Sequence, residues 1–186
     1  MRDHAWISVD GMPVGTLSRT LHEDALLVPP GRRLRVLVEE QGRVNYASRL
    51  GEPKGLIGEA TLDGEPLRGW TATPIDVAAA GALVADWDES DDGVRGMAGP
   101  FAWRGSFSLD RPADLFLDTA AWGRGYALVN GFVLGRYRRS GPKRTLYVPA
   151  PVLRRWSNSL VVIELDHVTD PVARFASRPE LGPREE

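Results

Sequence analysis

The stretch GYALVNGFVLGRYRRSGPKRTLYVP, residues 125–149, decides the fold class. Apolar and small residues alternate on both sides of Asn130-Gly131, and a further β-branched and aromatic run ends in a proline. Asn-Gly tolerates the positive φ angles of a two-residue hairpin turn, so the pattern predicts paired strands at 126–130 and 132–138. A third strand is predicted at 145–148.

Similar short runs, bounded by Gly, Pro, Asn and Asp, recur along most of the chain, and helical periodicity is scarce. The pattern therefore predicts an all-β protein. The other predicted strands are 6–9, 14–17, 25–28, 35–39, 57–62, 107–109, 113–119 and 160–166.

An internal repeat predicts two related β-sandwich domains. WISVDGMPVG (6–15) parallels YALVNGFVLG (126–135), so a matching hairpin turn is predicted at Asp10-Gly11, and ALLVP (25–29) parallels TLYVP (145–149) in the same order. A segment rich in Ala, Gly and acidic residues separates the copies. We therefore expect a first domain at 1–76, a linker at 77–98 and a second domain at 99–186. Two predicted strands precede the second hairpin, whereas the first begins only a few residues before its own, so the first domain is expected to lack its opening strands.

Composition excludes several classes of protein. The 186 residues, 42% of them hydrophobic, suffice for a core, and the absence of cysteine excludes disulfides and thiolate metal sites. A net charge of −2 gives no general attraction to nucleic acid, so no nucleic-acid partner is expected. There is no apolar run of membrane-spanning length and no signal-peptide pattern, so the expected location is the cytoplasm, with no membrane partner.

No metal site or cofactor is expected. His4, His22 and His167 are far apart and lack the spacing of metal ligands, so they are interpreted as surface histidines. The acidic segment 88–93 resembles the start of a calcium loop, but Gly99 stands where the loop needs a bidentate glutamate. We interpret this segment as a solvated acidic linker.

Several uncommon strings carry a resemblance to a known family. VNGFVLGRY and TLYVP, within residues 114–166, resemble the C-terminal galactose-binding-like domain of glycoside hydrolase family 35 β-galactosidases. GRVNY and KGLIG, within residues 36–64, resemble the preceding β-domain of those enzymes. The resemblance implies two jelly-roll-like, galactose-binding-domain-like sandwiches, the first truncated at its N-terminus. The chain departs from the family at Arg138, where a tryptophan is common.

The resemblance also implies that catalysis belongs to an N-terminal (β/α)8 barrel that these residues do not supply. Retaining glycosidases need two carboxyl groups roughly 5–5.5 Å apart. Glu39 and Glu40 adjoin at a predicted strand end, where successive side chains point to opposite faces, and Glu185 and Glu186 lie at the C-terminal end. No residue is therefore expected to be catalytic, and the chain alone is expected to be inactive.

Two residues are candidates for sugar contact. In the family, the tyrosine of GRVNY reaches the galactose pocket of the barrel, which implies a substrate-binding role for Tyr46 in the presence of a barrel and a weaker one for Asn45. Five tryptophans are interpreted as core residues: Trp6, Trp70, Trp103, Trp122 and Trp156. The basic residues between 136 and 144 are interpreted as a solvated strand face and turn.

The favoured function is therefore the non-catalytic C-terminal part of a β-galactosidase, which supports the barrel and contributes to the galactoside pocket. The alternatives are a free-standing, lectin-like carbohydrate-binding module and an inactive remnant of a split gene. Expected partners are a galactoside, a barrel polypeptide or a second copy of the chain. Self-association is expected because missing strands would leave Ile7, Val9 and Val36 uncovered, unless the segment 77–84 folds back over them.

Overall fold

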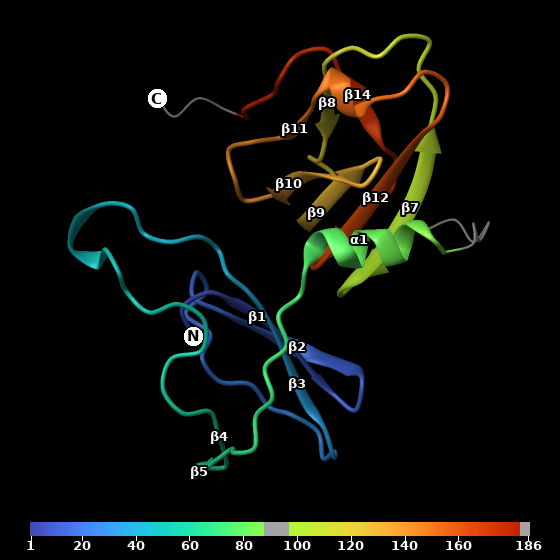
Figure 1. Cartoon of the computed structure of the whole chain (residues 1–186). Coiled ribbons are helices and arrows are strands. Elements are labelled where there is room, and N and C mark those ends of the chain that lie inside the picture. The colour runs from blue at the N-terminus through green and yellow to red at the C-terminus, as the bar shows by residue number, and fades with distance from the viewer. Residues whose placement is uncertain (88–96, 183–186) are drawn as a thin grey trace. The chain divides into compact units, whose positions relative to one another are not determined.

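The computed structural model describes residues 1–87 and 97–182, and the chain forms two compact units, Met1–Ala72 and Thr73–Glu186. Figure 1 shows the elements of each unit. Antiparallel strands dominate both units, so the predicted all-β class is confirmed.

The first unit is built on one three-stranded antiparallel sheet of order β2-β1-β3. Its strands are β1 (His4–Val9), β2 (Met12–Ser18) and β3 (Leu34–Glu39). A two-residue hairpin of β4 (Thr61–Leu62) and β5 (Glu65–Pro66) and the 3-10 turn η1 (Ala47–Arg49) lie outside this sheet. The predicted strand over 57–62 is therefore wrong apart from its last two residues.

The predicted turn at Asp10-Gly11 is confirmed, with φ angles of 50° and 88°. The Asp10 carboxylate accepts hydrogen bonds from the backbone N–H groups of Arg32 at 3.0 Å and Arg33 at 2.9 Å. One aspartate thus stabilises both the left-handed turn and the entry to β3.

The predicted strand at 25–28 does not form. Residues 25–28 are followed by Pro29-Pro30 and join no sheet, although the matching run in the second unit is a strand. That run pairs with β8, and the first unit forms no counterpart of β8. A strand needs a neighbour for its backbone N–H and C=O groups, so the same sequence pattern gives irregular structure here.

The second unit is a β-sandwich. One sheet has the order β10-β9-β12-β7 and the other β11-β8-β14. The first sheet contains β7 (Phe101–Phe107), β9 (Arg124–Val129), β10 (Phe132–Arg138) and β12 (Asn158–Glu164). The second contains β8 (Leu115–Asp118), β11 (Thr145–Val148) and β14 (Arg174–Ala176). A short ladder joins β6 (Met97–Ala98) to β13 (His167–Val168), and η2 (Ala150–Val152) follows β11.

The alternation of β9 and β12 produces two separate apolar layers. Ala127, Val129 and Val162 belong to the core cluster that also takes in Leu117 and Val148 of the other sheet. The residues between them on β9 and β12 point to the opposite face. The four-stranded sheet is therefore apolar on both faces, and its outer face needs a cover.

The cover is the helix α1 (Val77–Ala85), which packs on β12, β7, β9 and β10 of the second unit. Val84 contacts a cluster that contains Leu128 and Val161. A Cβ on Gly81 would lie 2.4 Å from Leu128 Cδ2, so glycine permits the close approach. The Asp76 carboxylate caps the helix by accepting from the Ala78 N–H at 2.8 Å.

This helix corrects two expectations. Residues 77–85 were predicted to be linker, but a run of alanines after an N-cap aspartate favours a helix. The segment 77–84, expected as a possible cover for the first domain, packs on the four-stranded sheet of the second unit. In the sheet of the first unit Ile7 and Val9 are buried and Val36 is half-buried, so the residues predicted to be uncovered are not the exposed ones. The acidic segment 88–93 lies outside the described residues.

Candidate functional site

The residues that carry the family resemblance in the first unit lie on a long loop after β3. Residues 41–55 leave the end of β3 and return to the start of β1, as the cyan segment of Figure 1 shows. Such a loop can present side chains away from the sheet only if its base is fixed. The fixing group is a buried carboxylate.

Asp3, fully buried, holds both ends of the loop. Its carboxylate accepts from the N–H of Gln41 at 3.0 Å and of Gly55 at 2.5 Å, and it forms an ion pair with Lys54 Nζ at 2.9 Å. Burial alone would raise the pKa of Asp3, but these hydrogen bonds and the Lys54 charge outweigh it and leave the pKa below its usual value. We call Asp3, Gln41, Lys54 and Gly55 the loop clamp.

A second contact strengthens the base of the loop. The Arg19 guanidinium makes a bidentate ion pair with the Glu52 carboxylate, and the Arg19 N–H donates to the Asp3 carbonyl at 3.0 Å. The hydrogen bond from Arg19 lowers the pKa of Glu52. The base of the loop is therefore held by charged groups from β1, from the residues after β2 and from the loop itself.

The tip of the loop carries both predicted contact residues. Tyr46 is 82% exposed, has extended backbone and precedes η1, while its neighbour Asn45 is also exposed. Ala47 has a positive φ of 64°, which turns the chain directly after the tyrosine. The loop thus has a buried, charged base and a tip that presents an aromatic ring to the surroundings.

The sequence indicates the tip of this loop but not the contacts that hold its base. The signals were present: an aspartate immediately before the first strand, and the lysine and glycine of KGLIG. Their partnership depends on a contact between residues about fifty positions apart, which no local pattern reveals.

In the second unit the family-like motifs have structural roles. Trp122 is buried, and its indole N–H donates to the Asp170 carbonyl at 3.1 Å. A Cβ on Gly125 would lie 2.0 Å from the Ile163 carbonyl oxygen, so no other residue fits there. The Tyr137 hydroxyl donates to the buried Glu164 carboxylate at 2.9 Å. These residues bring β9, β10 and β12 together.

Glu164 is the buried carboxylate of the second unit. Its Oε1 accepts from the backbone N–H groups of Arg124 at 2.8 Å and Asp166 at 2.9 Å, and its Oε2, the partner of Tyr137, also accepts from the Gly123 N–H at 3.3 Å. Burial nevertheless raises its pKa, and burial beside Glu164 raises the pKa of Tyr137. Glu164 has no second carboxylate among its hydrogen-bond partners in the described part of the chain, and its contacts are those of a structural group.

The predictions for the tryptophans are correct for three of the five. Trp6 and Trp122 are buried, and Trp103 packs edge-on against Trp122 with ring centroids 5.2 Å apart. Trp70 and Trp156 are 48% and 57% exposed, so their assignment to the core is wrong. Both lie outside the helices and strands, where no sheet face is available for the ring to pack against.

The adjacent carboxylates Glu39 and Glu40 lie in different environments. Glu39 is buried at the end of β3, whereas Glu40 is exposed and pairs with Arg43 at 3.2 Å. Within residues 1–87 and 97–182 no group of three or more His, Cys, Asp or Glu side chains could hold a metal ion. Glu185 and Glu186 lie outside this range. In the same part of the chain no helix is long and apolar enough to cross a membrane.

Comparison with known proteins agrees with these observations. Residues 1–76 match the family model "Beta-galactosidase, first all-beta domain", and residues 100–158 match "Beta-galactosidase, galactose-binding domain". Proteins named beta-galactosidase from Macaca fascicularis and Homo sapiens are each 33% identical over 98% of this chain. One from Xanthomonas manihotis is 36% identical over 86% of it.

The fold and the two matches define a pair of non-catalytic all-β domains of a glycosidase. The chain belongs to the β-galactosidase family. It spans about 30% of the length of the primate relatives and 27% of the Xanthomonas relative.

Proposed function

We propose that this chain is the non-catalytic β-domain part of a β-galactosidase of glycoside hydrolase family 35. It supports a catalytic barrel and contributes Tyr46 to the galactoside pocket, with Asn45 in a lesser role. The observation that carries the proposal is the loop with a clamped base and an 82% exposed tyrosine at its tip. An aromatic ring is a good platform for the C–H face of a sugar.

The loop clamp supports this role energetically. A tyrosine on a freely moving loop would lose conformational entropy when it bound a sugar, which weakens binding. Here the ends of the loop are already fixed by Asp3 and by the pair of Arg19 and Glu52. The barrel supplies the two carboxylates that hydrolysis needs, and this chain positions one wall of the pocket.

Complementation tests the proposal. The purified chain is mixed with the separately produced barrel part of a related β-galactosidase, and hydrolysis of nitrophenyl galactoside is measured. We expect no turnover from the chain alone and restored turnover in the mixture. Tyr46→Ala should lower the restored kcat/KM about tenfold, mainly through KM, because it removes one stacking contact.

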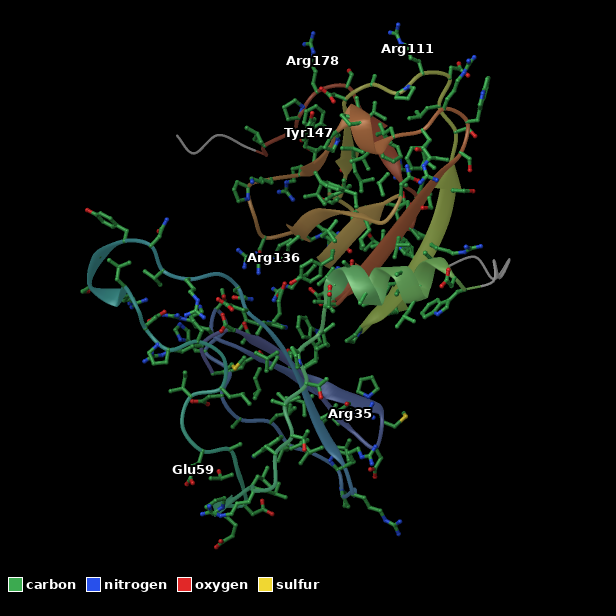
Figure 2. The ribbon with its side chains drawn as sticks, in the orientation of Figure 1. Arg35, Glu59, Arg111, Arg136, Tyr147 and Arg178 are labelled. Carbon is green, nitrogen blue, oxygen red and sulfur yellow. The ribbon has the colours of Figure 1, made fainter. Side chains whose placement is uncertain are left out.

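Tyr147→Ala is the matched control, since Tyr147 is a half-exposed tyrosine of the other unit (Figure 2). It should leave the restored kcat/KM unchanged. Turnover by the chain alone that disappears on substitution of one of its own carboxylates would refute the non-catalytic role. Equal effects of the two tyrosine variants would refute the role of Tyr46.

A free-standing carbohydrate-binding module is the second candidate, and the match of residues 100–158 to a galactose-binding domain favours it. This function requires the chain alone to be retained on an immobilised galactoside and released by free galactose. Retention only in the presence of the barrel would favour the first proposal.

A further inference from the structure

The side of the second unit where β10 and β11 approach each other contains a pocket of about 180 Å³. β10 and β11 are each the edge strand of their sheet, and the segment 139–144 joins them (Figure 1). Lining residues include Arg136, Arg138 and Lys143, together with Thr119 and Leu146. The pocket is therefore basic in a chain whose net charge is −2.

The neighbouring cations are used within the protein. Arg139 Nη1 contacts His167 Nε2 at 2.9 Å, and Arg144 Nη1 donates to the Arg139 carbonyl at 3.1 Å. In contrast, Arg138 and Lys143 form no ion pair with any residue of the described ranges. Their charges are thus available to a ligand in the pocket that they line.

The alternation along β10 keeps the two arginines out of the sandwich core. Tyr137 is buried in the sandwich, so Arg136 and Arg138, its neighbours along the strand, project from the opposite face. An arginine presents paired N–H donors that match a carboxylate or sulfate, and Lys143 adds a point charge from the adjoining turn. The volume is below the roughly 300–1,000 Å³ of sites for drug-sized ligands, so it suits one charged group and not an oligosaccharide.

We propose that this pocket binds the anionic group of an acidic sugar, either a sulfate ester or a uronate carboxylate. The anionic part of the proposal stands on the pocket and its two available cations. The sugar part rests on the proposed function, because residues 100–158 match a galactose-binding domain and include all of the residues that line the pocket.

The test is a titration of the full, isotope-labelled chain with galactose 6-sulfate, galacturonate, neutral galactose and inorganic sulfate, followed by NMR at the amides of Thr119 and Leu146. One or both acidic sugars should shift these amides at concentrations at which galactose does not. Arg138→Gln and Lys143→Gln should each weaken the binding about fivefold, since each removes one partly exposed charge pair. Added salt should weaken it further.

Arg178→Gln is the matched control, because Arg178 is exposed and lies well apart from Arg136 in the view of Figure 2. It should leave the affinity unchanged. The acidic sugar that binds more tightly shows whether the pocket prefers a sulfate ester or a carboxylate.

The proposal is overturned if galactose binds as tightly as the acidic sugars, if no anion shifts the two amides, or if inorganic sulfate binds as tightly as galactose 6-sulfate. A negative result would leave the proposed function intact, because that function is tested with neutral galactosides and with Tyr46.

Discussion

The two units share one hairpin pattern but stabilise it in different ways. In the second unit β9 and β10 lie in a sheet that packs on another sheet, with eleven buried residues in the core cluster between them. In the first unit β1 and β2 lie in a three-stranded sheet, and the buried apolar residues Ala5, Trp6, Ile7 and Val9 all come from β1. The turn pattern fixes the hairpin, whereas the neighbouring strands decide whether a two-layered domain forms around it.

The two units also differ in the apolar side chains that they expose. Leu21, Leu27 and Leu50 of the first unit are 65%, 95% and 62% exposed, and each lies in an irregular segment. The first unit compensates for its small apolar core with charged contacts at its loop clamp, whereas the second unit is stabilised by apolar packing. This contrast leads to three predictions.

The largest effect is expected when the units are produced separately. Residues 73–186 should unfold cooperatively in urea, because this segment contains both sheets and their cover. Residues 1–72 should give no cooperative transition, because one three-stranded sheet buries too little apolar surface to offset the entropy of ordering the chain. Circular dichroism during urea unfolding measures both.

The whole chain provides the control through sedimentation over a wide concentration range. Self-association that is lost in residues 73–186 alone would locate the exposed apolar surface in the first unit. A cooperative transition of residues 1–72 at a concentration where they are monomeric would show that this unit folds by itself. That result would contradict the proposed difference in stability between the two units.

Removal of α1 should have the next largest effect. Residues 99–186 should still fold, as the sequence predicts, but with a free energy of unfolding lower by roughly 3–6 kcal/mol than that of residues 73–186. The reason is that Leu128 and Val161 lose their cover, at about 1.5–3 kcal/mol for each buried side chain. Urea unfolding of both segments measures the difference in their free energies of unfolding. Equal values would show that the packing of α1 on the sheet contributes no stability.

The smallest effect concerns the two buried carboxylates, whose pKa values are shifted in opposite directions. The pKa of Asp3 is lowered, so its contribution to stability is present above the ordinary aspartate pKa and is lost as the pH falls below it. The pKa of Glu164 is raised, so its contribution is full below the ordinary glutamate pKa and is lost as the pH rises through the folded value. The first unit should therefore weaken in acid, and the second should strengthen.

The quantity to measure is the protection of the Ala5 and Val162 amides from hydrogen exchange, relative to the intrinsic exchange rate at each pH. One sample then reports on both units. Asp3→Asn should cost roughly 2 kcal/mol at neutral pH, since it disrupts hydrogen bonds to buried groups, and should remove the acid dependence at Ala5. Glu164→Gln should flatten the profile at Val162 alone. Parallel pH profiles at both amides would contradict the difference between the units.

The sequence predicted the fold best where local chemistry decides the structure. Asn130-Gly131 and Asp10-Gly11 form the predicted turns, because their conformational preference acts within two residues. The strand predicted at 25–28 failed because pairing depends on a distant partner. The predicted linker failed at α1 because the composition gave no sign of the sheet face that the helix covers. At the candidate site, Tyr46 came from resemblance, whereas Asp3 and Lys54 needed the tertiary contact.

The loop clamp also affects how the sequence of the loop can evolve. Closing a loop costs entropy that grows only slowly with loop length once the ends are held together. Because Asp3 joins Gln41 to Gly55, residues 42–51, which precede the ion-paired Glu52 and Lys54, can be inserted, deleted or exchanged at little cost to the rest of the unit. The clamp performs in this cysteine-free chain the task that a disulfide performs elsewhere, and it leaves the sequence of the tip around Tyr46 free to diversify.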